Sequence, residues 1–415
     1  MRITIFGSYN NSSIGDKAIL VSLLHLLFNN SPENLKVNVF EFQKGALEPE
    51  LSKYKWNKNV TIFSLSQNSS TLEETNNNFF LKRIFKSLPK SLRTLIAMLL
   101  FQKSIKRFSV ENSNALIIGG GNLLMDLYPA WPGRLFVLYR LFTTKRKPIY
   151  LIGVGAFPIS QRINDYLLKK VAKGSKYVLV RDKDTLNYVQ RKWGLQAEYI
   201  PDLALSYPLS KPYNSQSRKK NIVAVNVVPI YGKGWPYQDE EKYQRYIETI
   251  SKQLFDYYLL NNKTRYVFYD TNYPMNRSAS LAVIKELLKS HYPKEFISYE
   301  DRLHTSDEIT KILMNCNYSI TTKLHAAILA LRTGIPVIAL VYQPKVKSVL
   351  RALGIHEKAI LELKELDNLS ERMIMLDNGD ERFKLDNKKL VRIQEKTNSF
   401  IRKILDDISE SAINS

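Results

Sequence analysis

One histidine in the sequence lies where proton transfer would be useful. The apolar run Tyr318–Thr321 predicts a strand and 325–332 predicts a helix, so His325 falls on the first turn of that helix, just after Lys323. Imidazole titrates near neutral pH and is the commonest general acid or base. A lone histidine is more often structural, but the neighbouring lysine and the strand-to-helix junction favour a role in catalysis. We therefore predict that His325 transfers protons, with Lys323 beside it.

Two further cations follow predicted strands. Arg181 comes directly after Tyr177–Val180, and Lys345 follows the strand predicted at 336–341. Because ligands of open parallel sheets bind at the carboxyl ends of the strands, both cations are candidates to bind an anionic substrate. Arginine can grip a carboxylate or phosphate with two parallel hydrogen bonds. The alternatives are a surface arginine beside a helix-capping Asp182 and a solvated loop lysine.

Three glycine-rich segments also follow predicted strands: Gly7–Asp16, Gly119–Asn122 and Gly153–Pro158. Glycine lets a ligand approach the backbone closely, and a helix N-terminus behind such a loop attracts anions. The first loop lacks the Gly-Lys-Ser/Thr of a phosphate-binding P-loop, and helix capping by Ser13 or Asp16 would also explain it. The predicted ligand-binding residues of these loops are Ser13, Gly15, Asp16, Gly119, Gly120, Gly121, Asn122, Gly153 and Gly155.

The elements that must position these residues form two similar halves. Strand-like apolar runs alternate with helical patterns, first between residues 2 and 180 and again between 221 and 341. This alternation predicts two doubly wound α/β domains, each with a parallel sheet between helices. The predicted boundaries are 1–207 for the first domain, 208–220 for a linker, 221–385 for the second domain, and 386–415 for a C-terminal helix that packs back on the first.

Composition limits the classes of partner. The 415 residues include 61 Lys and Arg against 39 Asp and Glu, a net charge of +22, which points to nucleic acid, an anionic membrane surface or anionic small molecules. One cysteine and five scattered histidines argue against a disulfide framework and a metal site. With no signal peptide or apolar run long enough to span a membrane, we expect a cytoplasmic protein.

Much of the positive charge lies in one segment. Residues 81–108 hold eight Lys and Arg and no acidic residue, and their apolar residues cluster. Such a segment suits an anionic bilayer, which would make the protein peripheral on the inner face of the plasma membrane. An ordinary pair of surface helices is the alternative. No recognisable RNA- or DNA-binding module accompanies the charge, so we do not expect a nucleic-acid partner.

The motifs, taken in order, resemble the polysaccharide pyruvyl transferase family. The matching segments are Ser13–Leu20, Gly119–Asp126, Gly153–Pro158, Arg181-Asp182, Pro201–Ala204, Lys323–Ala326, Gly334–Pro336 and Tyr342–Lys345. Two positions depart from the family pattern: Lys323 stands where arginine is usual, and Ser13 where asparagine is usual. Lysine keeps the charge of arginine but loses its bidentate geometry.

The resemblance implies two Rossmann-like domains facing a cleft, as in GT-B glycosyltransferases. It also implies phosphoenolpyruvate as donor, with no other cofactor, and a pyruvate ketal formed on a sugar of a surface polysaccharide or its lipid-linked precursor. His325 would be the acid/base, and Arg181, Lys323 and Lys345 would hold the donor. The alternative is a GT-B nucleotide-sugar glycosyltransferase, since Glu300 and Glu308 have the eight-residue spacing of such enzymes, although Thr305 to Glu308 also reads as a helix cap.

Overall fold

The chain forms two compact units in the computed structural model, which describes residues 1–9, 12–31, 34–65, 87–105, 112–128, 130–156, 159–210 and 221–413. The first unit consists of Met1–Asn11, Ile19–Leu203 and Glu395–Ser415; the second consists of Ser12–Ala18 and Ala204–Gln394. The sequence placed the loop Ser12–Ala18 in the first domain, 1–207. The structure groups it with the second unit, where Ile14 N donates to Thr271 O at 3.0 Å. Most of the expected linker lies outside the described residues.

The first unit is built on an eight-stranded sheet in which every pairing is parallel. Its strand order is β3-β2-β1-β4-β6-β7-β8, with β5 pairing only with β6. The order reverses between β1 and β4, which makes that point the topological switch of the sheet. The strands are β1 (Arg2–Phe6), β2 (Lys36–Glu41), β3 (Val60–Ser64), β4 (Ala115–Gly119), β5 (Asn122–Leu124), β6 (Ile149–Ala156), β7 (Tyr177–Val180) and β8 (Glu198–Tyr199).

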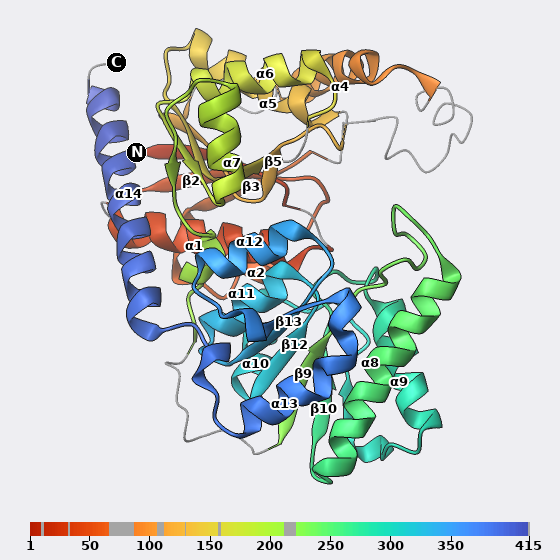
Figure 1. The fold of residues 1–415 in the computed structure, drawn as a ribbon. Coiled ribbons are helices and arrows are strands. Elements are labelled where there is room, and N and C mark those ends of the chain that lie inside the picture. Colours follow the sequence, from red (N-terminus) through yellow and green to blue (C-terminus); the bar gives the residue numbers. More distant parts are fainter. Residues whose placement is uncertain are drawn as a thin grey trace. The chain divides into compact units, whose positions relative to one another are not determined.

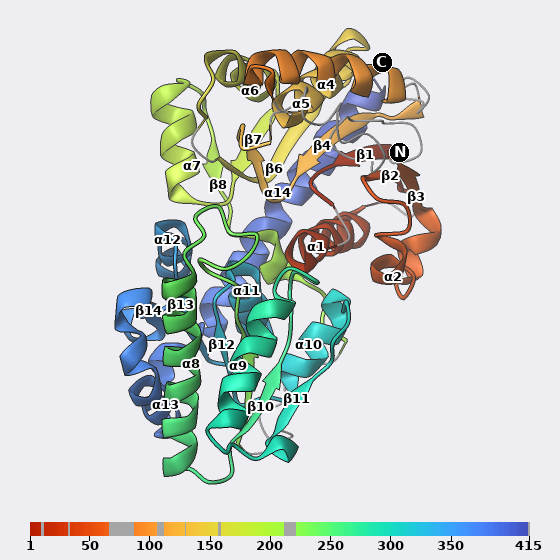
Figure 2. The same cartoon turned by 90° about the vertical axis from the view of Figure 1, so that its right-hand side faces the viewer.

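Helices cover both faces of this sheet. Figures 1 and 2 show α1 and α14 on one face and α4, α5 and α6 on the other. The helices are α1 (Ile14–Asn30), α2 (Glu48–Leu51), α4 (Lys90–Ile105), α5 (Ala130–Thr144), α6 (Arg162–Lys173), α7 (Lys183–Asn187) and α14 (Asn387–Ile413). Being covered on both sides, the central strands are continuous apolar runs: all five residues of β4 are buried. The end of α14 is fastened to β6, where Tyr150 donates to Asp407.

The second unit repeats the plan with six parallel strands in the order β11-β10-β9-β12-β13-β14. Here the switch lies between β9 and β12. The strands are β9 (Ile222–Asn226), β10 (Arg265–Phe268), β11 (Ile297–Tyr299), β12 (Tyr318–Thr321), β13 (Val337–Val341) and β14 (Ile360–Glu362), and the helices are α8 (Glu240–Leu260), α9 (Arg277–Lys289), α10 (Ser306–Met314), α11 (Leu324–Arg332), α12 (Pro344–Ala352) and α13 (Leu369–Asp377).

The two doubly wound α/β units predicted from the sequence are confirmed, but one glycine segment differs from expectation. The sequence predicted a strand-like run at Pro148–Gly155 and a turn at Gly153–Pro158, which overlap. In the structure the strand reading holds there: β6 continues through Gly153 and Gly155 to Ala156, with an irregularity in its pairing to β7 between Ile152 and Val154. Gly153, at φ +64°, makes this possible because a residue with a side chain rarely adopts that conformation. Phe157 and Pro158 lie outside the described residues.

Two observations limit what else these units contain. Of the helices in the described part of the chain, none has both the length and the apolar character needed to cross a membrane. The same residues include no group of three or more His, Cys, Asp or Glu side chains placed to hold a metal ion. Only 87–105 of the basic segment 81–108 is described.

Candidate functional site

Several of the predicted site residues meet at the carboxyl edge of the second sheet. Here β9 ends at Asn226 and β12 ends at Thr321, the two strands that flank the switch point. Thr322 binds back to β9, its N and Oγ1 both donating to Asn226 O, at 2.9 and 3.1 Å. The chain then turns into α11, and the turn brings Lys323 and His325 to this edge.

His325 lies in the first turn of α11, as predicted, and packs directly on Gly15. A Cβ atom built on Gly15 would lie 2.1 Å from His325 Nδ1, closer than any real side chain approaches. Only glycine therefore fits at this position without moving the imidazole. Two contacts hold the loop in place: Ile14 N donates to Thr271 O, and Ser306 Oγ donates to Ile14 O at 3.4 Å.

Lys323 is enclosed by the same loop. We assign the amide of Asn272 from its hydrogen bonds: its nitrogen donates to Ser12, and its oxygen accepts from Lys323 Nζ at 3.1 Å. Burial lowers the pKa of Lys323, and the nearby carboxylate of Asp16 opposes that shift. Burial thus makes this ammonium easier to deprotonate than an ordinary lysine, while Asp16 helps to keep it charged.

The same edge holds buried polar atoms that no described residue satisfies. Asn226 Oδ1 and Thr271 Oγ1 are both buried and have no hydrogen-bond partner in the described part of the chain. Such atoms are rare in protein interiors, and each one needs an explanation. A polar ligand at this edge would supply one.

The first loop thus brings three predicted residues to Lys323 and His325. Ser13 pairs with Asn272 in an isolated antiparallel β-bridge. Its Oγ also accepts a hydrogen bond from Asp16 N at 3.4 Å, so Ser13 caps the helix as the alternative interpretation predicted. Gly15 contacts the histidine, and Asp16 acts on the lysine through its charge. Lys345, the other predicted cation of this unit, is in the first turn of α12, which follows β13, the neighbour of β12 at the same edge.

In the first unit, the glycines after β4 have a packing explanation. A Cβ on Gly119 would lie 2.9 Å from Leu23, and one on Gly120 would lie 2.1 Å from Ile19, so helix α1 occupies the space. Gly120 also has φ +74°. Tyr9 OH donates to Gly119 O at 2.8 Å. The sequence favoured ligand approach here; in the structure, close packing of α1 against the strand end already requires glycine at both positions.

Arg181 is at the end of β7, as predicted, but its charge is balanced within the unit. Its Nη1 contacts Asp202 Oδ2 at 3.0 Å, and both side chains are almost completely buried. Its Nη2 donates to Asn122 Oδ1 at 2.8 Å. Two of the donors expected to bind an anion are therefore engaged, and only Nε is buried without a partner among the described residues. Asp182 caps α7 by accepting from Thr185 N.

The remaining glycines of the first unit are likewise engaged by protein. Gly155 N donates to Gly121 O at 2.8 Å, which links the ends of β6 and β4. A Cβ on Gly153 would lie 3.0 Å from Leu203. Asn122 heads the short strand β5 and pairs with Gly155. The structure brings Asn122, Gly121, Gly155 and Arg181 together through contacts internal to the protein.

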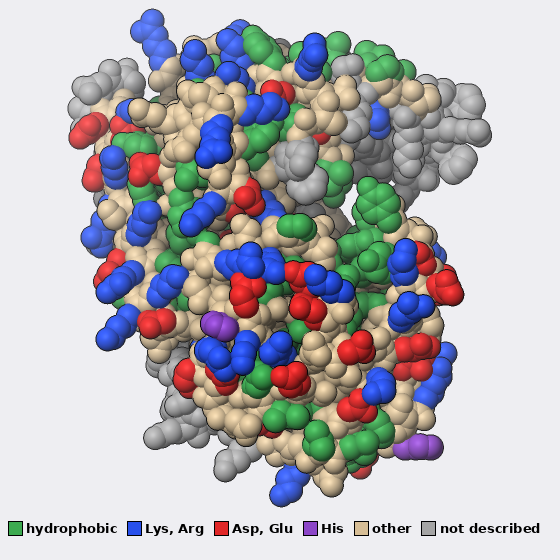
Figure 3. Space-filling model, in the orientation of Figure 1, with side chains coloured by type: hydrophobic (Ala, Val, Ile, Leu, Met, Phe, Trp, Pro, Cys, Tyr) green, Lys and Arg blue, Asp and Glu red, His purple; other side chains and the backbone are tan. Residues whose placement is uncertain are grey.

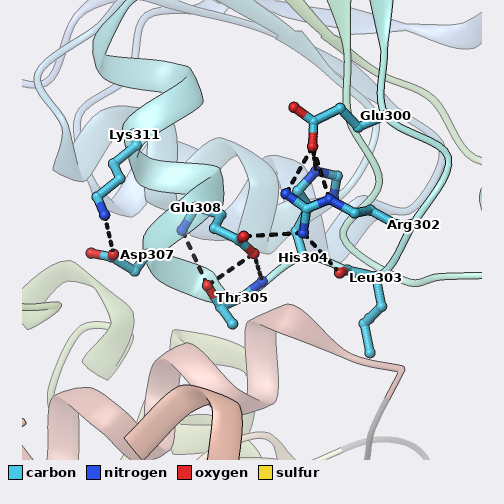
Figure 4. A network of polar contacts seen from close by, with 8 residues as sticks. All are labelled: Glu300, Arg302, Leu303, His304, Thr305, Asp307, Glu308 and Lys311. Carbon is cyan, nitrogen blue, oxygen red and sulfur yellow. Dashed lines mark hydrogen bonds and ion pairs between the residues drawn. The ribbon is translucent and has the colours of Figure 1, made fainter. Parts of the chain in front are cut away.

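The glutamate pair that favoured the alternative function has structural partners. Glu308 and Thr305 form a complete capping box at the start of α10, and Arg302 lies between Glu308 and Glu300, with Nη1 3.0 Å from Glu308 (Figure 4). The imidazole of His304 is almost fully buried, and its Nε2 lies 3.4 Å from Glu300 Oε2. The eight-residue spacing is therefore explained by the helix cap and its ion pairs.

Sequence reasoning missed three residues of the second unit's edge. Asn272, Thr271 and Asn226 follow or end strands β10 and β9, so the rule that ligands bind at the carboxyl ends of strands could have identified them. Their polar side chains carry no motif of their own, and their contact with the loop Ser12–Ala18 depends on folding.

Comparison with known proteins places the chain in a family and its fold among known structures. A family model described as polysaccharide pyruvyl transferase matches residues 14–344. No curated protein matches significantly. Solved structures that resemble it include a UDP-GlcNAc 2-epimerase from Neisseria meningitidis bound to UDP-GlcNAc, with TM-score 0.57, 12% identity, and coverage of 100% of both chains.

Two further structures support the same architecture. A putative UDP-N-acetylglucosamine 2-epimerase from Listeria monocytogenes has TM-score 0.60 and 12% identity, over 100% of this chain and 98% of that one. A trehalose-6-phosphate synthase has TM-score 0.58 and 14% identity, over 99% of both chains. At these identities the likeness concerns the fold alone: two Rossmann-like domains of the GT-B type.

Proposed function

The chain belongs to the polysaccharide pyruvyl transferase family, and from that premise we propose that it transfers a pyruvyl group from phosphoenolpyruvate to a sugar. The acceptor would be a sugar of a surface polysaccharide or of its lipid-linked precursor. The product is a pyruvate ketal, and phosphate is released. The observation that carries this proposal is the cluster at the edge of the second sheet, where an imidazole and an ammonium lie together against the loop Ser12–Ala18.

The reaction needs an acid that protonates carbon, and a cation that binds the negative charges of phosphoenolpyruvate. In the proposed reaction, His325 protonates the methylene carbon of phosphoenolpyruvate, and one sugar hydroxyl adds to the neighbouring carbon as it loses its proton. The bond from that carbon to the phosphate oxygen then breaks, and a second hydroxyl of the same sugar closes the ketal. One hydroxyl proton returns to His325 and the other leaves with phosphate, so atoms and charge balance.

The cations have different proposed parts. Lys323 would face the carboxylate or phosphate of the donor, with Lys345 at the same edge as a second cation. Arg181 was also predicted to bind the donor. While its pair with Asp202 is intact, the positive charge of Arg181 is already balanced by a buried carboxylate, which leaves less of it for a donor anion. We propose that its first task is to hold Asn122 and the glycine segment in place.

The setting we propose is the cytoplasm, at the inner face of the plasma membrane, because a lipid-linked acceptor would be found there. A direct test incubates the purified protein with phosphoenolpyruvate and a panel of hexosides that differ in their free hydroxyls. Phosphate release and a product heavier by pyruvic acid minus water are expected. If a strain lacking the protein keeps every such ketal on its surface glycan, this assignment is wrong.

The runner-up, a nucleotide-sugar glycosyltransferase, keeps the support of its GT-B fold. The spacing of Glu300 and Glu308 no longer supports this function independently, since both carboxylates form ion pairs with Arg302. A thermal-shift comparison separates the two functions. Stabilisation by phosphoenolpyruvate is expected; stabilisation by nucleotide sugars alone would favour the runner-up.

A further inference from the structure

Helix α4 of the first unit turns an apolar face outward. Leu92, Leu95 and Leu99 are 40, 51 and 55% exposed, at spacings of three and four residues, so they form one stripe along the helix. The opposite face is used in the fold: Phe101 and Ile105 are in the hydrophobic core, and Met98 packs against Gly133 of α5. A helix with a filled inner face has no packing reason to carry leucines on its outer one.

Helix α6 presents a matching face. Its first turn exposes Ile163 and Tyr166, at 45 and 54%. Lys170 follows on the same side, with its ammonium 5.4 Å from the Tyr166 ring, and Lys173 is exposed one turn further. This order, apolar then aromatic then basic, is typical of a helix at a membrane interface, where tyrosine and lysine lie at the headgroup level.

A buried polar junction fastens these elements together. Thr94 of α4 donates to Asn164 of α6 at 3.1 Å, and Asn164 donates to Asp126 at 3.3 Å. Asp126 also accepts from the backbone of Ser160 and Gln161, both at 2.9 Å, just before α6. The next two residues after Asp126 are Leu127 and Tyr128, which are exposed as well. The junction therefore holds three segments that expose large apolar side chains.

We propose that this face, defined as Leu92, Leu95, Leu99, Leu127, Tyr128, Ile163 and Tyr166, docks on an anionic lipid bilayer. Charge complementarity selects the occupant: Lys170 and Lys173 of α6 are exposed beside this face, and the sequence of α4 contains no acidic residue. In Figure 3, Lys and Arg side chains and hydrophobic side chains lie together over α4 and α6. Exposed leucines would enter the acyl region while the cations contact lipid phosphates.

The acidic residue of α6 beside this face does not oppose its docking on an anionic bilayer. Asp165 of α6 accepts hydrogen bonds from Tyr188 and Trp193 and pairs with Lys192, so its charge is balanced within the protein. The inference rests on the proposed function, which places the protein at a membrane, and it specifies the surface that would contact the lipid. Its test measures lipid binding without donor or acceptor, so failure here is distinguishable from failure of pyruvyl transfer.

The experiment is sedimentation of the full chain with vesicles of phosphatidylcholine, with or without phosphatidylglycerol. We expect binding only to the anionic vesicles, weakened by salt. The variant Leu95→Gln/Leu99→Gln should lower the partition coefficient about tenfold or more, since each leucine loses its apolar burial. The matched control is Leu259→Gln/Leu260→Gln at the end of α8, two leucines that are at least as exposed but outside this face.

Three outcomes would overturn the proposal. One is equal sedimentation of the two double variants, and another is no binding to anionic vesicles. The third is a concentration-dependent dimer, seen by analytical ultracentrifugation, that Leu95→Gln/Leu99→Gln dissociates, which would make the face an interface between two copies. Circular dichroism melting of both variants checks that they fold. An exchange of Lys170 and Lys173 for glutamine should reduce the salt-sensitive part of binding and leave the fold unchanged.

Discussion

The two sheets have corresponding strand orders around their switch points, β3-β2-β1-β4 and β11-β10-β9-β12, yet their carboxyl edges are filled differently. In the first unit, Ile19 and Leu23 of α1 occupy the space that the glycines after β4 leave, and the charge of Arg181 is balanced by buried Asp202. In the second unit, His325 rests on Gly15, and Lys323 is held where burial lowers its pKa against the opposing effect of Asp16.

The difference teaches that similar sequence signals can serve different ends. Glycine segments and a terminal cation follow strands in both units. In the first, the protein's own side chains fill the space beside the glycines and balance the charge of the arginine, although Arg181 Nε stays buried without a partner among the described residues. In the second, Lys323 and His325 lie at the edge that holds the unsatisfied atoms Asn226 Oδ1 and Thr271 Oγ1. Substitutions at the first edge should therefore reduce stability first, and those at the second should reduce turnover first.

The largest expected effect is at the second edge. The variant His325→Gln should lower phosphate release from phosphoenolpyruvate by about 10²–10⁴-fold, because the proton donor to carbon is lost. Its melting temperature should stay near that of the parent. Exposed His356, in the same unit, provides the control His356→Gln, which should keep full turnover. Normal turnover in His325→Gln would remove this residue from the mechanism.

The buried pair of the first edge comes next. Arg181→Met should lower the free energy of unfolding by about 3–5 kcal/mol, because Asp202 is left buried and unpaired. The double variant Arg181→Met/Asp202→Leu should recover much of that loss in denaturant titrations. The exposed ion pair between Arg277 and Asp301 provides the control. Removing it through Arg277→Met should change the free energy of unfolding by about 1 kcal/mol or less. A stable Arg181→Met that has lost donor affinity would break the comparison between the edges.

The glycine segment offers a third test. Gly120→Ala combines a left-handed backbone with a clash against Ile19, and should destabilise by about 2–4 kcal/mol in urea unfolding. Gly194→Ala has a similar positive φ but no neighbour within 4 Å, so it isolates the backbone contribution. Equal losses in the two variants would show that α1 does not require the glycine.

A fourth test uses acid. Burial raises the pKa of Asp126, but hydrogen bonds from Ser160, Gln161 and Asn164 outweigh it and leave the pKa below its ordinary value. The stabilisation is therefore complete above the ordinary carboxyl pKa and is lost as pH falls through the lowered one. The variant Asp126→Asn should lose about 1–3 kcal/mol of unfolding free energy at neutral pH. Its melting temperature should also fall less steeply than that of the parent as the pH is lowered. An equally steep fall in the two proteins would contradict this account.

The smallest effect concerns Lys323 and the donor. Because its pKa is lowered, the ammonium is lost earlier as pH rises, and affinity for phosphoenolpyruvate should decline with it. Lys323→Arg keeps its charge, so its affinity should remain flat from neutral to alkaline pH, and should change at neutral pH by about 1 kcal/mol or less. Calorimetric titration measures both. Parallel pH curves for the two proteins would separate Lys323 from the donor.

Much of the fold followed from apolar patterns. The strands predicted at Tyr177–Val180, Tyr318–Thr321 and 336–341 match β7, β12 and β13 within one residue, since a parallel strand covered on both faces must be apolar throughout. The short strands β5, β8 and β14 were missed because two or three residues carry too little pattern. Their formation depends on pairing with a strand that is already in place. Gly153 was predicted in both a strand and a turn because a positive φ inside a strand has the same sequence signature as a turn.

The sequence by itself determined two α/β units, the order of the motifs and the positions of His325, Lys323 and Arg181 at strand ends. Those features depend on local pattern and on the rule that parallel strands end at one edge. Only the tertiary structure decided that Asp202 balances Arg181, that α1 requires Gly120, and that Gly15 supports the imidazole. The availability of a charge or a space depends on burial and on partners from distant segments, which no local pattern records.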